Sequence, residues 1–410
     1  MRLLFVTNLY PPVSLGGYEQ ICFDVASGLQ ARGHEVSVLT SMFRASEAPS
    51  EQRGVYRRLK LLKGWGSQTP GQEKWVGRNR VAVEVHNSRV TRRAINRLQT
   101  DIVMFWNGSN MGRGLLSTAE KQARVVYYLS DPWLAPLLAR QAHGWDAGVG
   151  RRLYHMLLTM LGVPSQPIST EHLLFCSNSL RAEYAALGAG VSNGTIIYHG
   201  ISPEAFPLAS RAPFEAGGEV RLLYAGRVSP EKGIGTLVEA MHHLGSLQPH
   251  PKATLRIVGP ARDDAYEQEL KQQIGRLGLD GVVRMDGPVP RHELKDLYAA
   301  HDIFVFPSEW AEPFSVTLLE AMSTGLPVLA SLRGGTAEIV RDGENAVAFK
   351  AGDAQDLAAK LHWMASHPQE VAQLGVTAAE EVRERFTLTR EVSAIENYLA
   401  GVKAGTDSGR

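Results

Sequence analysis

Short runs of apolar, largely β-branched residues alternate with helical stretches along the whole 410-residue chain, and the alternation occurs twice. In the first series, runs at 3–6 and 35–40 flank an amphipathic stretch at 17–32. The other runs of the two series lie at 101–106, 125–129, 173–176, 195–198, 220–225, 253–258, 282–285, 303–306 and 327–330. Apolar strands that alternate with helices form parallel sheets covered on both faces. The pattern therefore predicts two doubly wound α/β domains.

A stretch rich in proline, alanine and glycine at 202–218 marks the expected boundary between these domains. We assign residues 1–203 to an N-terminal domain and 204–386 to a C-terminal domain, and we expect 403–410 to form a disordered tail. Open α/β sheets bind ligands beyond the carboxyl ends of their strands. Two facing sheets would therefore place one ligand in the cleft between them.

Positive and negative charges nearly balance over the whole chain, but they are unevenly distributed along the sequence. The formal net charge is +1, which argues against a nucleic-acid-binding protein, yet segment 51–97 holds 12 basic and 3 acidic residues. One interpretation of this segment is a peripheral contact with anionic lipid headgroups, and a second is attraction of a phosphorylated substrate. The alternative is a solvated arginine-rich face. The apolar run at 153–161 follows Arg151 and Arg152 and could add a small membrane-facing patch, but we expect it to pack in the core.

The cysteines and the apolar stretches indicate the compartment. Cys22 and Cys176 are far apart and predict neither a disulfide framework nor a zinc site. The apolar start is too short for a signal peptide, and no apolar stretch reaches the about 18 residues of a membrane-spanning helix. We therefore expect a cytoplasmic protein, peripheral at the inner face of the membrane if the basic segment contacts lipid.

Two glutamates, Glu312 and Glu320, lie eight residues apart after the run at 303–306. If a helix begins near Ser315, its free backbone N–H groups would attract a phosphate, while Glu320 could accept hydrogen bonds from a ribose and Glu312 from a sugar hydroxyl. The alternative is one surface glutamate and one glutamate that interacts with the helix dipole.

Two glycine-containing loops follow other strands. After 220–225, Gly226 permits a tight turn, and Arg227 and Lys232 supply a planar fork and a point charge suited to a diphosphate. The alternative is a surface loop with two solvated cations. Gly16 and Gly17, which precede the first helix, permit close approach of a ligand but do not form the G-x-G-x-x-G fingerprint of dinucleotide binding.

Taken together, these motifs resemble the GT-B glycosyltransferases, and specifically the retaining family 4. The resemblance extends from Met1 to about Ala400. It rests on the Gly-Gly loop, R-G-H-E-V at 32–36, G-R-x-x-x-x-K-G at 226–233, E-x7-E at 312–320 and G-G-x-x-E at 334–338. It implies two Rossmann-like domains that face across a cleft, and a last helix, 387–402, that packs back on the first domain.

The resemblance also implies a role for each matching residue. Arg227 and Lys232 would hold the donor diphosphate and, with Glu312 at the donor sugar, form the catalytic set. The remaining donor-binding residues would be Gly16, Gly17, Gly226, Val289, Phe314, Ser315 and Glu320. Residues at the ends of N-terminal strands, and one at the hinge, are candidates for acceptor contacts: Trp106, Asn107, Asp131, Trp133 and His199. Asp131 could instead cap a helix that begins at Pro132, and His199 could simply pack near the hinge.

The function implied is transfer of a hexose from a nucleoside-diphosphate sugar, most simply a UDP-sugar, to a hydroxyl of a glycan, a lipid-linked acceptor or a small molecule, with retention. The departing phosphate oxygen would take the acceptor proton, and neither a cofactor nor a metal is expected, since no Asp-x-Asp clamp is present. Where many members carry a histidine, this chain has Ser130. The alternatives are a nucleotide-sugar epimerase of the same fold and a catalytically degenerate nucleotide-binding scaffold subunit.

Overall fold

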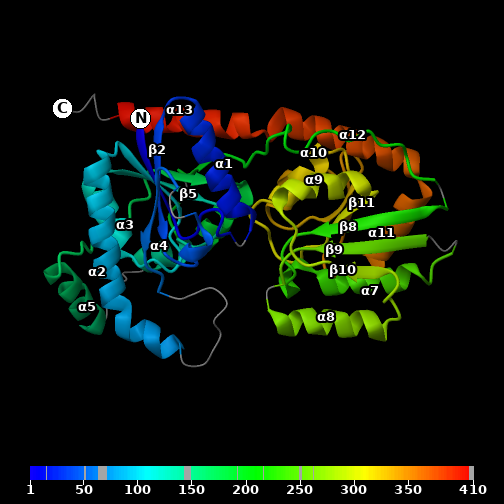
Figure 1. The fold of residues 1–410 in the computed structure, drawn as a ribbon, viewed down its shortest axis with the longest axis horizontal. Coiled ribbons are helices and arrows are strands. Elements are labelled where there is room, and N and C mark those ends of the chain that lie inside the picture. Colours follow the sequence, from blue (N-terminus) through cyan, green and yellow to red (C-terminus); the bar gives the residue numbers. More distant parts are fainter. Residues whose placement is uncertain are drawn as a thin grey trace. The chain divides into compact units, whose positions relative to one another are not determined.

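A computed structural model of the chain describes residues 1–14, 16–49, 52–62, 72–142, 149–191, 193–215, 217–248, 252–261 and 263–405. The chain divides into two compact units (Figure 1). The N-terminal unit comprises Met1–Tyr198 together with Glu391–Arg410, and the C-terminal unit comprises His199–Arg390. Each unit is built on its own parallel sheet, as the alternating pattern predicts.

The N-terminal unit holds a seven-stranded sheet in the order β3-β2-β1-β4-β5-β6-β7. Its strands are β1 (Arg2–Thr7), β2 (Glu35–Ser41), β3 (Val55–Leu59), β4 (Ile102–Asn107), β5 (Arg124–Leu129), β6 (Leu173–Phe175) and β7 (Thr195–Ile196). Its helices are α1 (Gly17–Ala31), η1 (Ala45–Glu47), α2 (Gln72–Leu98), α3 (Gly114–Gln122), α4 (Ala135–Ala142), α5 (Val149–Met160), α6 (Asn178–Ala186) and most of α13 (Leu388–Ala404). The central strands are buried on both faces, which explains their unbroken apolar runs.

The C-terminal unit holds a six-stranded sheet in the order β10-β9-β8-β11-β12-β13. Its strands are β8 (Glu219–Ala225), β9 (Lys252–Val258), β10 (Val283–Met285), β11 (Ile303–Phe306), β12 (Val328–Ser331) and β13 (Val347–Phe349). Its helices are η2 (Pro230–Lys232), α7 (Ile234–Leu244), α8 (Asp264–Arg276), α9 (Arg291–Ala300), α10 (Val316–Ser323), η3 (Gly335–Glu338), α11 (Ala354–Ser366) and α12 (Pro368–Arg385). Figure 1 shows α7 and α8 on one side of this sheet and α9 and α10 on the other.

Both sheets reverse their strand order at one point. In the N-terminal unit the chain builds outward from β1 through β2 and β3, then returns to place β4 on the other side of β1. In the C-terminal unit the chain builds outward from β8 through β9 and β10, then returns to place β11 on the other side of β8. Loops on opposite faces diverge there and leave a crevice for ligands at the carboxyl ends of the strands.

Helix α13 lies against the N-terminal unit through named polar contacts. The Tyr128 hydroxyl donates to the buried Glu391 carboxylate at 2.8 Å, and Arg32 donates to Glu396 at 2.8 Å. Helix α13 also includes Lys403, which the sequence analysis assigned to the tail. Its ammonium donates to Asp101 at 3.1 Å, which explains why the helix continues, whereas 406–410 lie outside the described residues.

Candidate functional site

Four loops meet at the carboxyl ends of the strands in the C-terminal unit. The Gly226 N–H donates to Val258 at 2.9 Å, and the Gly259 N–H donates to Gly287 at 2.8 Å, which joins the loops after β8, β9 and β10. The loop after β11 joins them because Glu309 N–H donates to the Glu231 carbonyl at 3.0 Å. These bonds fix the backbone of the rim that carries the donor-binding residues predicted from sequence.

Lys232 and Glu312, which sequence analysis predicted separately, are in direct contact. The Lys232 ammonium donates to the Glu312 carboxylate, and the Ser308 hydroxyl donates to the same oxygen at 2.8 Å. The Lys232 ammonium also lies 5.7 Å from the centroid of the Trp310 ring. The side chains are 15% and 8% exposed, so the ion pair is nearly buried. Ser308 and Trp310 were not predicted, because their role depends on how the β11 loop folds.

Arg227 lies beside this pair on the loop after β8. Its backbone carbonyl accepts a hydrogen bond from the Tyr224 hydroxyl at 2.7 Å, which fixes the start of the loop. Its guanidinium reaches only 3.8 Å from the Glu231 carboxylate and is 39% exposed. Among the described residues its Nε has no hydrogen-bond partner. The cation is therefore weakly engaged by the protein and has donors left for an anion.

The G-G-x-x-E turn holds the backbone of Glu312. The Gly335 N–H donates to the Glu312 carbonyl at 2.6 Å, and Gly334 has φ = +62°, a conformation that favours glycine. A Cβ on Gly335 would overlap the Pro313 carbonyl oxygen, and one on Gly334 would overlap that of Glu312. Both glycines are thus required for the loop after β12 to pack directly against the backbone of the loop after β11.

The second glutamate is buried and bound by two side chains of α9. Helix α10 starts at Val316, with the Ser315 hydroxyl accepting from the Leu318 N–H at 3.3 Å, so the expected helix start is where the sequence places it. Glu320 accepts from Arg291 Nε at 2.8 Å and from the Tyr298 hydroxyl at 3.3 Å. Burial and the nearby Glu320 carboxylate raise the pKa of Tyr298 well above its usual range. Sequence reasoning missed Arg291 and Tyr298.

His199 and Phe314 also lie in the C-terminal unit, where their rings are 6.0 Å apart and nearly perpendicular. His199 is buried and lies beside Phe314, a residue predicted to bind the donor. Val289 is half-buried in the loop after β10.

In the N-terminal unit, Asn107 and Asp131 form a polar cluster at the ends of β4 and β5. The Asn107 amide donates to the Asp131 carboxylate at 3.0 Å, and the Trp133 N–H donates to it at 2.9 Å. Burial raises the pKa of Asp131 to about 6. The capping alternative is wrong, because α4 begins only at Ala135 and the carboxylate closes a local turn instead. Gly16 caps α1 at the end of the β1 loop, directly before Gly17.

The predicted stacking role of Trp106 is wrong. Its side chain is fully buried and packs against Phe5, Tyr18 and Tyr128, with ring centroids 5.5, 6.4 and 4.6 Å away. The reason is topological: β4 lies in the centre of the sheet, so residues just before its end are covered on both faces.

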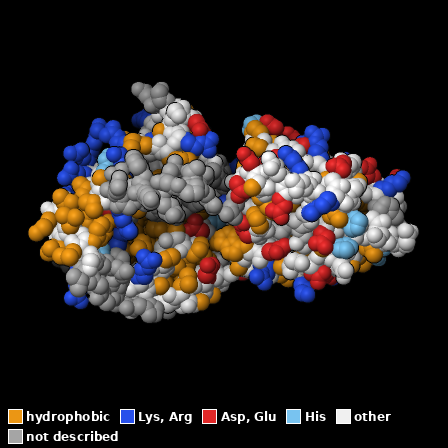
Figure 2. Space-filling model, turned by 90° about the horizontal axis from the view of Figure 1, so that it is seen from below, with side chains coloured by type: hydrophobic (Ala, Val, Ile, Leu, Met, Phe, Trp, Pro, Cys, Tyr) orange, Lys and Arg blue, Asp and Glu red, His pale blue; other side chains and the backbone are white. Residues whose placement is uncertain are grey.

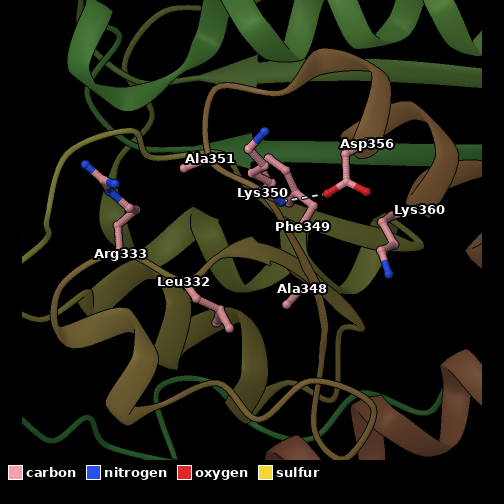
Figure 3. A pocket seen from close by; sticks show the side chains of 8 residues that line it. All are labelled: Leu332, Arg333, Ala348, Phe349, Lys350, Ala351, Asp356 and Lys360. Carbon is pink, nitrogen blue, oxygen red and sulfur yellow. Dashed lines mark hydrogen bonds between the residues drawn. The ribbon is translucent and has the colours of Figure 1, made fainter.

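A pocket of about 520 Å³ lies at the ends of β12 and β13 in the sheet of the C-terminal unit. Figure 3 shows its lining, with the Lys350 backbone bonded to the Asp356 carboxylate at 2.7 Å. Arg333, Lys350 and Lys360 make it basic, but none of the predicted donor-binding residues lines it. We place the candidate site at β8 and β11, where cations, carboxylates and a helix start converge.

Substitution of Gly335 tests the packing around Glu312. We expect Gly335→Ala to lower the free energy of unfolding by about 1–3 kcal/mol, since the new methyl group overlaps backbone. Gly281→Ala is the matched control, because a Cβ there meets nothing within 4 Å. Chemical denaturation measures both, and equal stabilities would contradict the tight packing.

The raised pKa of Asp131 predicts a pH dependence of stability. The folded state holds its proton up to about pH 6, whereas an unperturbed aspartate loses it near 3.8, so stability should fall as pH rises between these values. Asp131→Asn should abolish that fall, which amounts to about 3 kcal/mol. Urea titrations at several pH values measure it, with the exposed Asp296→Asn as control. Parallel pH profiles for wild type and Asp131→Asn would refute the assignment.

Comparison with known proteins gives the family. A model described as Glycosyltransferase Family 4 matches residues 15–205, and one described as Glycosyl transferases group 1 matches residues 207–381. The chain is 28% identical to glycogen synthase of Mycobacterium tuberculosis over 417 residues, which span 99% of this chain and 96% of that protein. A D-inositol 3-phosphate glycosyltransferase of Streptomyces bingchenggensis is 33% identical over 189 residues, covering 45% of this chain and 41% of that protein.

Solved structures give the fold. Sucrose-phosphate synthase from Thermosynechococcus elongatus superposes with a TM-score of 0.74 at 18% identity, covering 98% of this chain and 99% of that one. Anabaena Alr3699/HepE in complex with UDP and glucose superposes with a TM-score of 0.70 at 23% identity, covering 98% and 100%. With GT-B neighbours and two successive domain matches over nearly its whole length, the chain belongs to the family 4 glycosyltransferases.

Proposed function

We propose that this protein transfers a sugar from a nucleoside-diphosphate sugar to a hydroxyl acceptor, with retention at the anomeric carbon. The observation that carries the proposal is the convergence of Arg227, Lys232 and Glu312 beyond the carboxyl ends of the neighbouring strands β8 and β11. UDP is the expected nucleotide, since the solved Anabaena relative is in complex with UDP and with UDP-glucose.

The diphosphate of the donor is the group that Arg227 and Lys232 bind. Arg227 supplies a planar fork whose Nε is unengaged in the described structure, and Lys232 supplies a point charge. Lys232 would exchange its contact with Glu312 for a phosphate oxygen, which frees the Glu312 carboxylate to accept from a sugar hydroxyl. The start of α10 at Ser315 and Val316 adds backbone N–H groups to the same anion.

The nucleoside is held by the neighbouring loops. Glu320 is positioned by Arg291 and Tyr298, and its carboxylate accepts hydrogen bonds from the ribose. Val289 and the adjoining loop after β10 contact the base, while the backbone at Phe314 and Ser315 faces the sugar. Gly16 and Gly17, at the start of α1, are proposed as further donor-binding residues.

In the reaction, the bond between the anomeric carbon and the phosphate oxygen breaks while a bond to the acceptor oxygen forms on the same face. The departing phosphate oxygen takes the acceptor proton, so no strong protein base is needed. Arg227 and Lys232 neutralise the charge that develops on the diphosphate, a role that requires no metal or cofactor. Asp131, Asn107 and Trp133 orient the acceptor hydroxyl.

Arg227→Ala tests the proposal. Thermal unfolding with millimolar UDP, GDP, ADP or dTDP in EDTA should show a shift of a few degrees for one diphosphate with the wild type. We expect Arg227→Ala to lose most of this shift and at least two orders of magnitude in turnover of the nucleotide sugar, as removal of a preorganised charge-stabilising donor does.

The matched control is Arg276→Ala, which removes an exposed arginine from the last turn of α8 in the same unit. It should bind and turn over as the wild type does. Turnover of Arg227→Ala within a factor of a few of wild type would refute the assigned role. If a nucleoside diphosphate raises the unfolding temperature of the wild type but the protein turns over none of the nucleotide sugars tested, the scaffold alternative is favoured.

A further inference from the structure

Helix α5 exposes an apolar face to solvent. Leu153, Met156, Leu157 and Met160 recur at the spacing of one helix face, and Leu161 directly follows the helix. Each of the five is exposed, Met160 by 77% and Met156 by 52%. This apolar run was expected to pack in the core, and that prediction is wrong for all but its inner face, where Leu158 is buried. We name the five exposed residues the α5 face.

The α5 face is a contiguous surface and not a scatter of single side chains. Among the described residues eleven large hydrophobic side chains are exposed, and five of them form this face. Figure 2 shows hydrophobic side chains gathered at the left of the view, with blue side chains of Lys and Arg along their border. A helix on the surface of a water-soluble domain normally turns a polar face outward, so a helix that is apolar on both faces indicates a further contact.

Arginines of α2 flank the α5 face. The Arg92 guanidinium donates to the Gly162 carbonyl at 2.7 Å, which places it at the C-terminal end of α5. The Arg80 guanidinium lies 5.5 Å from the Tyr154 ring centroid, nearer the other end. Figure 1 shows α5 beside α2. Further exposed arginines of α2, one helical turn apart, are Arg89, Arg93 and Arg97.

Acidic side chains do not offset these cations on the described parts of the two helices. Helix α5 contains no Asp or Glu. On α2 from Arg80 to Leu98 the one acidic residue is Glu84, and it is buried, accepting from the Gly114 N–H at 2.6 Å. The surface therefore combines the α5 face with a flanking row of arginines from α2 that has no exposed acidic side chain among the described residues of the two helices.

We propose that the α5 face docks on an anionic phospholipid bilayer. Its apolar side chains enter the boundary between headgroups and acyl chains, while the arginines of α2 lie at the level of the lipid phosphates. A second copy of the chain fits this surface less well, since a two-fold contact through α5 would bring arginine borders together. No helix within the described residues is long and apolar enough to span a membrane.

Vesicle flotation of the full chain tests the docking. At about 0.1 M salt the wild type should float with phosphatidylcholine vesicles that contain about one third phosphatidylglycerol, and binding should fall at about 1 M salt. Met156→Glu combined with Met160→Glu should weaken binding at least tenfold with unchanged thermal unfolding, because both side chains are exposed. Arg89→Glu combined with Arg93→Glu should weaken binding to the anionic vesicles by a similar factor.

The control combines Leu187→Glu with Val376→Glu, which places the same two charges at exposed apolar positions outside the α5 face. It should bind as the wild type does. Absence of wild-type binding, or equal binding by the methionine variant, would overturn the proposal. So would sedimentation of the wild type as a dimer that the methionine variant dissociates, because the face would then belong to a second copy.

Discussion

The contact between the Lys232 ammonium and the Glu312 carboxylate joins loops that lie 80 residues apart in the chain. It forms because β8 and β11 are neighbours in the sheet, although two strands and three α-helices separate them in sequence. Burial of both ions costs desolvation energy that their mutual attraction only partly offsets. Such a pair is therefore poorly explained by stability alone. It is well suited to a site where a diphosphate replaces one partner.

The surrounding backbone is built to hold that pair. Gly334 and Gly335 let the β12 loop approach the β11 loop at Glu312, and Gly226 and Gly259 do the same for the loops after β8 and β9. The cation, the carboxylate and the start of α10 therefore lie on loops that directly follow strands of the sheet, and these loops are fixed by backbone hydrogen bonds. Preorganised charges of this kind need no rearrangement when negative charge develops on a leaving group.

The periodicity of the sequence was sufficient to predict most strands and the start of α10, because fully buried strands and helix caps leave local signatures. It was not sufficient for β3, whose arginines at 57 and 58 interrupt the apolar pattern of an edge strand, or for β13, which is only three residues long. The pattern also placed Trp106 wrongly. A residue near the end of a strand can line a ligand site or be buried inside the sheet, and the sequence cannot distinguish these positions until the strand order is known.

The sequence could not predict which side chains from other helices would bind a site residue. Glu320 fits its predicted position, but Arg291 and Tyr298 reach it only because α9 packs beside α10. For α5 the sequence predicted a burial that the structure does not have. The spacing of its apolar residues is the same whether that face of the helix is buried or exposed. Only the packing of α5 against α2 decides which half of the helix is covered.

A crystal structure of the chain with its nucleoside diphosphate tests the central claim most directly. The account predicts phosphate oxygens within hydrogen-bond distance of Arg227 and Lys232, with the Lys232–Glu312 contact broken and the ribose at Glu320. A diphosphate bound instead among Arg333, Lys350 and Lys360, with the Lys232–Glu312 pair intact, would contradict it.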